Sequence, residues 1–409
     1  MGEMRKARRA ALIAATVVLL AVTLGAGCGP DRAPRNVIVL IGDGMGFQQV
    51  RAASFYATGE AGKLAFERYY RGESATYSAD SYRTGDHATD SAAAATAIAT
   101  GRKTRNGALA SDPDGRDLPT VLEYLRSRGR WTGLVTTAPI THATPAGFGA
   151  HVPDRGDWGR VAEDYFQVTQ PNVLFGAYEA DAKYVMECDA LAAGYGVVHD
   201  RAELKQIVEQ AERADPRAAP AYVLGMFASA QLPWEYDDRM AWMWTDPEDL
   251  AKQTTYKTVP HLSEMAAAAL KILGTGPDGF FLMIEGGAID KACHANDLAQ
   301  AIDETLEFEK AFQAVMDWAK GRTDTLVIVT ADHETGGLWV VQGRKKGYRP
   351  KVVWGTKGHS GINVPVYAWG PGAERLVGVQ DDTQLYDVMT GGARPAAPRA
   401  PRKVAAKKK

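Results

Sequence analysis

Three apolar runs along the chain end abruptly in acidic residues, histidine or glycine. The first covers residues 37–41, the second begins at Phe280 and the third at Thr325. Short continuous runs of β-branched and large apolar residues are typical of strands that are buried on both faces of a parallel sheet. Each run is therefore predicted to be a strand with polar side chains at its carboxyl end.

A helical pattern lies between the second and third runs. Within residues 296–321, Leu298, Ile302, Leu306, Phe312 and Met316 recur at helical spacing, and the pattern stops at Gly321. A strand, a helix and a strand in this order form a βαβ unit. The chain is thus predicted to be an α/β protein with a largely parallel sheet and helices on its faces.

Two other segments have distinct patterns. Residues 338–342 and 348–354 flank the sequence GRKKG and are predicted to form a hairpin. Residues 233–250 are rich in aromatic and acidic side chains. We interpret them as a surface helix or insertion that packs its tryptophans inward, in preference to a rim over a substrate cleft.

The N-terminus is typical of an export signal. Residues 1–28 combine a basic start, an uncharged apolar run from Ala10 to Gly27, and small residues before Cys28. The pattern predicts a lipoprotein that is acylated at Cys28, although Gly25 departs from the usual leucine. Free export and an uncleaved anchor are the alternatives. The protein is thus expected in the periplasm or anchored to a membrane of the cell envelope.

The rest of the chain divides into a linker, one domain and a tail. Residues 29–35 are predicted to be a linker, residues 36–391 a single catalytic domain, and residues 392–409 a basic, disordered tail. The tail is expected to be solvated, with contact to anionic lipid or an envelope polymer as the alternative.

Charge is distributed unevenly along the chain. The 409 residues carry a formal net charge of -2, but the first nine carry +3 and residues 394–409 carry +7, which leaves -12 between them. An acidic body is a poor surface for nucleic acid, so no nucleic acid is expected as a specific partner, but it could hold several cations. Three cysteines are too few for a disulfide scaffold, and Cys188 and Cys293 need not pair.

Acidic residues follow all three predicted strands. Asp43 comes after the first strand, Glu285 ends the second, and Asp332 and His333 follow the third. Open α/β sheets bind ligands at the carboxyl ends of their strands. A single such acid is more often a cap or a turn residue, but three in one sheet predict a functional site.

Histidines add metal-ligand chemistry to these acids. Asp290 and His294 are four residues apart, so they project from one face of a helical turn. Such a pair can also be a surface hydrogen bond. Imidazole nitrogen with carboxylate oxygen suits zinc, and Asp332 with His333 forms a second such pair. His359, in the sequence GTKGHSG, could complete either set or be an ordinary exposed histidine.

Ser91 precedes a run of alanines that is predicted to be a helix. One interpretation is that Asp90 or Ser91 simply caps this helix. The other is that Ser91 is a nucleophile, because the free N–H groups and the dipole at a helix start favour an anion and an alkoxide. These residues alone favour the cap.

The combined motifs resemble the alkaline phosphatase family. IGDGMG, TDSAAAATA, HATPAGFGAHVPDR, EGGAIDKACH, TADHE and GHSG occur in the family's order and at similar separations over roughly residues 36–372. The resemblance implies a three-layer αβα sandwich and an exported hydrolase of phosphate monoesters that forms a phosphoserine on Ser91. Family members are often homodimers.

The resemblance also implies a set of metal ligands. It assigns one zinc ion to Asp290, His294 and His359, and a second zinc ion to Asp332, His333 and Asp43. A third ion, expected to be magnesium, would be held by Asp43, Thr144 and Glu285.

Three further positions take substrate roles from the resemblance. Arg155 would clamp phosphate oxygens, and its planar fork suits that task. Lys291 would contact phosphate through water or be a solvated lysine. His142 stands two residues before Thr144, where members have aspartate or histidine, and could reduce the preference of the third site for magnesium or admit zinc. Alternatives are a phosphodiesterase of the same superfamily or a non-catalytic lipoprotein that binds phosphate or metal.

Overall fold

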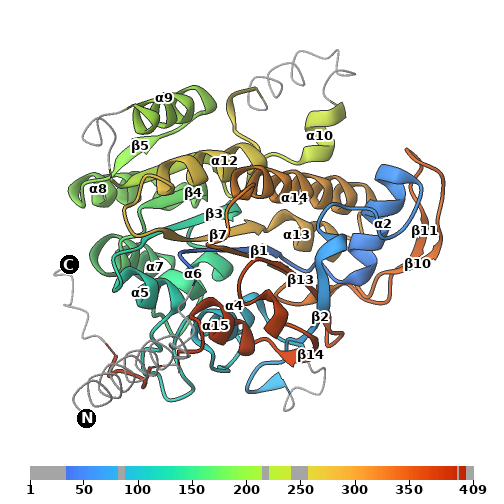
Figure 1. Cartoon of the computed structure of the whole chain (residues 1–409), viewed down its shortest axis with the longest axis horizontal. Coiled ribbons are helices and arrows are strands. Elements are labelled where there is room, and N and C mark those ends of the chain that lie inside the picture. The colour runs from blue at the N-terminus through green and yellow to red at the C-terminus, as the bar shows by residue number, and fades with distance from the viewer. Residues whose placement is uncertain (1–33, 82–87, 214–220, 241–256, 394–395, 402–409) are drawn as a thin grey trace, which may run out of the picture.

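A ten-stranded sheet forms the centre of the molecule (Figure 1). The structure is a computed structural model that describes residues 34–81, 88–213, 221–240, 257–393 and 396–401. The strands follow the order β14-β2-β13-β8-β1-β7-β3-β4-β6-β5, and only β13 runs against its neighbours β8 and β2. They are β1 (Asn36–Gly42), β2 (Tyr70–Ala75), β3 (Trp131–Pro139), β4 (Val173–Tyr178), β5 (Gly196–Val198), β6 (Val223–Ser229), β7 (Phe280–Gly286), β8 (Thr325–Thr330), β13 (Val364–Trp369) and β14 (Gly378–Asp381).

The three strands predicted from the apolar runs are adjacent at the middle of the sheet. β1 pairs in parallel with β7 on one side and with β8 on the other. Ile41 is in register with both Glu285 and Thr330. This register brings Asp43, Glu285 and Asp332 to one edge of the sheet, because each lies at or just beyond the carboxyl end of its strand.

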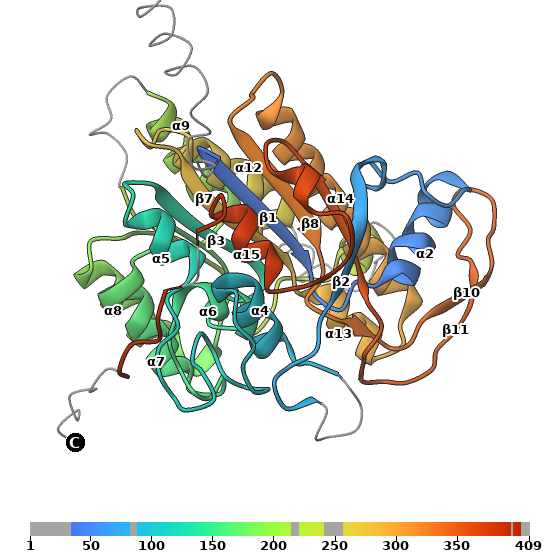
Figure 2. The ribbon, with the colours of Figure 1, turned by 60° about the horizontal axis from the view of Figure 1, so that its bottom comes forward.

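One face of the sheet is covered by helices that include the predicted long helix (Figures 1 and 2). That helix is α14, which connects β7 to β8 and completes the predicted βαβ unit. The helices of this face are α2 (Phe47–Thr58), α9 (Arg201–Glu212), α12 (Leu262–Leu273), α13 (Ala288–His294) and α14 (Leu298–Ala319).

The opposite face carries a second set of helices that starts with the alanine-rich α4. These are α4 (Ser91–Thr100), α5 (Val121–Arg126), α6 (Ala143–Gly149), α7 (Trp158–Asp164), α8 (Lys183–Ala192) and α15 (Gln384–Met389). All ten residues of α4 are buried. A Cβ at Gly147 of α6 would lie 2.8 Å from the Cβ of Ala95, so small residues let α4 and α6 pack closely. The molecule therefore has the predicted three-layer αβα architecture.

The predicted hairpin projects from one end of the molecule. β10 (Trp339–Gln342) pairs antiparallel with β11 (Lys351–Val353), with a register shift between Val340 and Gln342. The segment predicted at 233–250 contributes the short α10 (Glu235–Met240), and Trp234 packs against the core. The tryptophans at 242 and 244 lie outside the described residues.

The C-terminal tail differs in part from the sequence prediction. Residues 396–401 are described, and Arg399 forms an antiparallel bridge with Asp117. This short stretch is therefore attached to the body rather than disordered. The sequence prediction missed the attachment because nothing in the sequence pattern marks the loop around Asp117 as its partner. Residues 1–33, with the predicted signal and Cys28, lie outside the described residues. Within the described part, no helix has the length and apolar character needed to cross a membrane.

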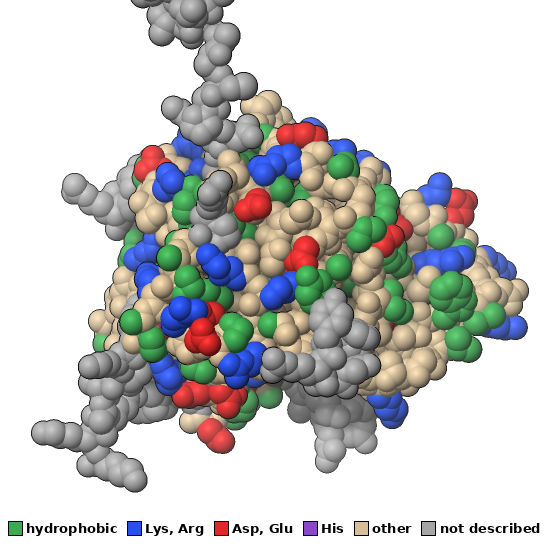
Figure 3. Space-filling model, turned by 90° about the horizontal axis from the view of Figure 1, so that it is seen from below, with side chains coloured by type: hydrophobic (Ala, Val, Ile, Leu, Met, Phe, Trp, Pro, Cys, Tyr) green, Lys and Arg blue, Asp and Glu red, His purple; other side chains and the backbone are tan. Residues whose placement is uncertain are grey.

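The surface seen from below is mixed in charge. Lysine and arginine side chains are interspersed with aspartate and glutamate over this face, and neither sign forms a continuous area (Figure 3). The predicted strand-end acids Asp43, Glu285 and Asp332 are buried and do not contribute to this surface.

Candidate active site

The ends of β1 and β8 bring a buried histidine against two carboxylates. His333 Nε2 lies 3.3 Å from Asp332 Oδ2 and 3.5 Å from Asp43 Oδ1, and the three side chains are almost fully buried. Gly44 follows with φ of 71°, and a Cβ there would come within 3 Å of Thr335 and Asp290. Glycine at this position lets the chain turn tightly beside the group.

A second acid–histidine group lies on α13 and the short strand β12 (His359–Ser360), which pairs antiparallel with β9 (Glu334–Thr335). His294 Nε2 is 3.2 Å from Asp290 Oδ2 and 3.2 Å from His359 Nε2, whereas His359 Nε2 is 3.7 Å from Asp290 Oδ1. The rings of His333 and His359 stack with centroids 3.6 Å apart, so the two groups adjoin. His359 therefore completes the set of Asp290 and His294.

All three histidines are oriented in the same way. The Nδ1 atom of His294 bonds the carbonyl of Lys357, that of His359 bonds the Thr89 carbonyl at 2.8 Å, and that of His333 lies 3.2 Å from Thr335 Oγ1. These partners leave each Nε2 facing carboxylates. Metal-binding histidines are held in this manner, with the second nitrogen donating to a carbonyl or another oxygen.

A third group surrounds Glu285 at the end of β7. Asp43, His142 and Glu285 each offer a ligand atom within 4.8 Å of the others, and the buried Thr144 belongs to the helix that His142 caps. Burial and the negative charge of Asp332 raise the pKa of Glu285 to about 7, although the hydroxyls of Thr136 and Thr144 oppose this. Burial and the charges of Asp332, Asp290 and Glu285 likewise raise the pKa of Asp43.

The carboxylates of this region fit bound cations. Among the described residues, both oxygens of Asp43, Glu285 Oε1 and Asp332 Oδ2 are buried without a hydrogen-bond donor. Buried carboxylates are costly unless they are paired or coordinate a metal. The imidazole and carboxylate donors of the first two groups suit zinc. In the third group, the carboxylates of Asp43 and Glu285 suit magnesium, whereas the imidazole of His142 suits zinc. We name the seven residues Asp43, Glu285, Asp290, His294, Asp332, His333 and His359 the strand-end site.

Ser91 lies beside the strand-end site at the first turn of α4. Its Oγ is 3.3 Å from His333 Nε2, and the side chain is buried. Asp90 caps the helix by accepting a hydrogen bond from Ala93 N at 2.9 Å. The capping interpretation thus holds for Asp90, while Ser91 points its hydroxyl at the site. The helix dipole and the free N–H groups of the first turn favour an anion there.

Arg155 reaches the same place from the loop after α6. Its Nη1 lies 3.1 Å from Asp90 Oδ2, and its Nη2 lies 3.2 Å from His142 Nε2. Burial and the positive charges of Arg155 and Lys291 lower the pKa of His142 to about 3, so this imidazole is neutral and accepts the hydrogen bond. Lys291, on α13, is half-buried. Burial lowers the pKa of Lys291, although the negative charges of Glu285 and Asp43 act in the opposite direction.

Several contacting residues were missed by the sequence reasoning. Thr335 Oγ1 donates to Asp290 Oδ1 at 2.5 Å and lies 3.2 Å from His333 Nδ1, so it links two ligand groups. Thr136, in register with Glu285, donates to its Oε2. The only sequence signal for Thr335 is its position two residues after His333, and Thr136 has none. Cys188 and Cys293 do not pair with each other, since Cys188 is a free, exposed thiol and Cys293 a free, buried one.

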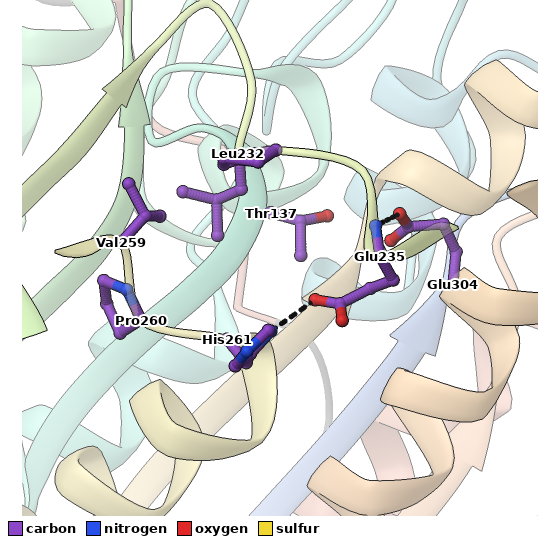
Figure 4. A pocket seen from close by; sticks show the side chains of 8 residues that line it. Thr137, Leu232, Glu235, Val259, Pro260, His261 and Glu304 are labelled. Atoms are coloured by element: carbon purple, nitrogen blue, oxygen red, sulfur yellow. Dashed lines mark hydrogen bonds and ion pairs between the residues drawn. The ribbon is translucent and has the colours of Figure 1, made fainter. Parts of the chain in front are cut away.

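A separate acid–histidine group lies away from Ser91, between α10, α12 and α14. Figure 4 shows His261 and Glu235 pointing toward each other, with Nδ1 and Oε1 2.8 Å apart, and Glu304 accepting from the backbone N–H of Glu235 at 2.9 Å. Glu307 completes the group, which we name the helix-side cluster (Glu235, His261 and Glu307). Its Oε1 accepts from Ser263 N and its Oε2 pairs with Lys310, both at 2.9 Å.

Comparison with known proteins identifies relatives over nearly the whole described chain. The family model described as alkaline phosphatase matches residues 34–170, 169–348 and 339–394. The chain is 35% identical to streptomycin-6-phosphate phosphatase of Streptomyces griseus, covering 94% of this chain and 96% of the relative. It is 32% identical to alkaline phosphatase 3 of Bacillus subtilis, covering 86% and 87%.

Comparison with solved structures also finds alkaline phosphatases. The cold-active alkaline phosphatase of a psychrophilic Shewanella species matches with a TM-score of 0.74 and 30% identity, covering 87% of this chain and 98% of that one. A histidine-to-glutamate variant of the alkaline phosphatase from the Antarctic bacterium TAB5, with Mg bound in its M3 site, matches with a TM-score of 0.70 and 26% identity, covering 88% and 97%.

Proposed function

This chain belongs to the alkaline phosphatase family and is a phosphoric monoester hydrolase, and we propose that it works through a phosphoserine formed on Ser91. The observation that supports this most is the position of Ser91 Oγ, 3.3 Å from His333 Nε2 at the start of α4. A serine hydroxyl is a weak nucleophile unless its surroundings favour the alkoxide. The helix start favours it, and cations held by the adjoining ligand groups would do so as well.

We further propose that the family's metal dependence takes the form of two zinc ions and one magnesium ion here. Asp290, His294 and His359 would hold one zinc, Asp332, His333 and Asp43 the other, and Asp43, Thr144 and Glu285 the magnesium. The TAB5 variant holds Mg in its M3 site after a histidine-to-glutamate change, so the M3 site of that relative can take magnesium when glutamate replaces the histidine. When bound, such cations supply positive charge to the entering and leaving oxygens of a phosphoryl transfer.

The residues of this chain divide the work of two displacement steps. In the first, Ser91 Oγ bonds to phosphorus, the bond from phosphorus to the ester oxygen breaks, and the proton of Ser91 is balanced by the one that the ester oxygen gains to leave as the alcohol. In the second, a water oxygen bonds to phosphorus, the bond to Ser91 Oγ breaks, one water proton restores the Ser91 hydroxyl, and inorganic phosphate leaves. Arg155 binds phosphate oxygens in both steps, and Asp90 and the neutral His142 hold its guanidinium.

Monoesters suit this arrangement better than diesters. Arg155 is placed to bind unsubstituted phosphate oxygens beside Ser91, and a diester has one fewer of them. We propose that Lys291 contributes a more distant positive charge, through water, and that His142 acts mainly on Arg155.

The cellular setting is also a proposal. The basic, apolar and small-residue pattern of residues 1–28 supports export, with Cys28 as a lipid anchor to the cell envelope. We propose a homodimer as the working assembly, as expected from the family. Labelling of Cys28 with a fatty acid analogue and sedimentation of the purified protein test these two points.

The direct test of the mechanism is hydrolysis of p-nitrophenyl phosphate at alkaline pH. Ser91→Ala is expected to lower kcat by about 10³-fold or more, because it removes the atom that bonds phosphorus. Ser127→Ala, at a surface serine after α5, is the matched control and keeps wild-type activity. Acid quenching with substrate, followed by peptide mass analysis, detects phosphate on Ser91. Normal turnover by Ser91→Ala contradicts the proposal.

A further inference from the structure

The C-terminal segment 396–401 is joined to the body close to α5. The N–H of Arg399 donates to the carbonyl of Asp117 at 2.8 Å, and the N–H of Asp117 donates to the carbonyl of Arg399 at 2.9 Å. Arg399 also places its guanidinium 2.7 Å from Glu123 Oε1. Arg102, which follows α4, donates to the carbonyl of Ala396 at 3.4 Å. Backbone pairing and two side-chain contacts thus fix the segment.

Glu123 connects this segment to His151. Its Oε2 lies 3.1 Å from His151 Nε2 and accepts from the N–H of Thr120 at 2.9 Å. Although burial acts in the opposite direction, the hydrogen bond and charge of His151, with the contact from Arg399, lower the pKa of Glu123 to about 2. Glu123 raises the pKa of His151 in return. A continuous chain of side-chain contacts therefore runs from Arg399 through Glu123 to His151.

His151 stands at the base of a small ladder that ends at Arg155. Its Nδ1 lies 3.0 Å from the carbonyl of Ala110. Leu109 and Val152 then exchange two backbone hydrogen bonds of 2.9 Å, and the N–H of Arg155 donates to the carbonyl of Gly107 at 2.8 Å. We name residues 107–110 with residues 151–155 the Arg155 ladder.

The far end of the Arg155 ladder meets the residue before Ser91. Asp90 Oδ2 accepts from the N–H of Gly107 at 2.9 Å and lies 3.1 Å from Arg155 Nη1. One carboxylate oxygen thus holds both the ladder and the guanidinium. A shift of the ladder would move the guanidinium relative to Ser91, and small misplacements of a phosphate-binding group are costly.

We propose that the C-terminal segment 396–401, acting through Arg399, Glu123 and His151, positions Arg155 for phosphate. The proposal rests on the function proposed above, in which Arg155 binds the phosphate oxygens. Arg399, Glu123 and His151 are positioning residues, since they act through the ladder. The alternative is that the attached segment has no effect on Arg155. The Arg399 side chain is 52% exposed, and exposed ion pairs contribute little to stability.

Two truncations of the full-length protein separate these views. One ends at Pro395 and removes the attached segment, and the matched control ends at Pro401 and removes only residues 402–409. We expect the shorter protein to show a Ki for inorganic phosphate, and a KM for p-nitrophenyl phosphate, raised by about fivefold or more. We expect the control to match the complete chain. Equal Ki values in all three proteins overturn the proposal.

Point variants then distinguish positioning from general destabilisation. Arg399→Ala is expected to raise the Ki by about two- to fivefold with an unchanged melting temperature, and Arg399→Lys to restore it in part. A Ki that rises only in proportion to a fall in melting temperature overturns the proposal. Glu123→Gln is the less specific variant, because Glu123 also caps α5.

The Arg155→Ala variant separates failure of this proposal from failure of the function. If Arg155→Ala leaves the Ki for phosphate unchanged, the assigned role of Arg155 is wrong, and the positioning proposal falls with it. If Arg155→Ala raises the Ki but the truncation does not, only the positioning proposal is wrong. In the Arg155→Ala background, we expect Arg399→Ala to have no further effect, because both act on one contact.

Discussion

The strand-end site and the helix-side cluster both combine acidic residues with histidine but differ in how their charges are balanced. In the helix-side cluster, Glu307 pairs with Lys310 and accepts from Ser263, while Glu235 bonds His261 directly. In the strand-end site, both oxygens of Asp43 are buried without a donor from the described residues. The first group is neutralised by the protein itself, whereas the second needs positive charge from elsewhere.

The histidines show the same contrast. His359 directs Nδ1 to a backbone carbonyl and leaves Nε2 facing Asp290, as a metal ligand does. His261 instead uses Nδ1 to bind a carboxylate, and Glu235 raises the pKa of His261 to about 8 through that hydrogen bond. Proximity of acids and histidines therefore does not by itself define a metal site. What distinguishes a metal site is the hydrogen-bond partner of the second ring nitrogen and whether each carboxylate oxygen already has a donor from the protein.

Loss of a proposed ligand should have the largest effect. His359→Ala is expected to lower kcat/KM by on the order of 10²–10³-fold or more and to reduce the zinc content of the purified protein. His261→Ala, the matched change in the helix-side cluster, is expected to keep its metal content and to stay within about twofold of wild-type activity. Elemental analysis and p-nitrophenyl phosphate hydrolysis measure both. Equal metal loss in the two variants contradicts the contrast.

An intermediate effect is expected at Thr335, which links two ligand groups. Thr335→Val keeps the shape of the side chain but removes the hydroxyl that bonds Asp290 and faces His333 Nδ1. Zinc affinity should fall by about 10–100-fold, since such partners orient ligands and fix the imidazole tautomer. Competition with a chromogenic chelator measures the affinity. Thr335→Ser should retain it, and a Val variant with wild-type affinity would show that the hydroxyl is dispensable.

The smallest effect concerns the pH dependence of stability in the helix-side cluster. Because the pKa of His261 is raised to about 8 in the folded protein, its contribution is complete below the unfolded value of 6.5 and is lost as pH rises through 8. After a discount for solvent exposure, the change is about 1 kcal/mol. Urea unfolding of metal-free wild type and His261→Gln at pH 6 and pH 9 measures it. An identical pH dependence in both proteins would exclude this contribution.

Much of the fold could be predicted because its signals are local. The apolar runs that became β1, β7 and β8 end where their polar residues begin, and the spacing of α14 is regular over its length. The ligand candidates were found for the same reason, since Asp43, Glu285 and Asp332 lie at or next to strand ends. In a parallel sheet, the strand ends must share one edge, so position in the chain implies proximity in space.

Other features depend on contacts between distant segments. Neither Thr335 nor Thr136 has a sequence pattern that marks it as a ligand partner, because each acquires its role only through its neighbour across the sheet or loop. The attachment of residues 396–401 also could not be predicted, since a basic, proline-containing tail is typical of disorder unless a complementary acid is placed beside it. Glu123 is that acid, and only the fold brings it to Arg399.

The sequence by itself determined the α/β class, the strand-end acids, the nucleophile candidate and the family. The tertiary structure decided how these groups are balanced: His359 joins Asp290 and His294, Asp90 holds Arg155, and the helix-side cluster satisfies its own charges. The physical reason is that residue type and spacing fix which donors and acceptors exist, whereas the pairing of a buried donor with an acceptor depends on packing between segments far apart in the chain.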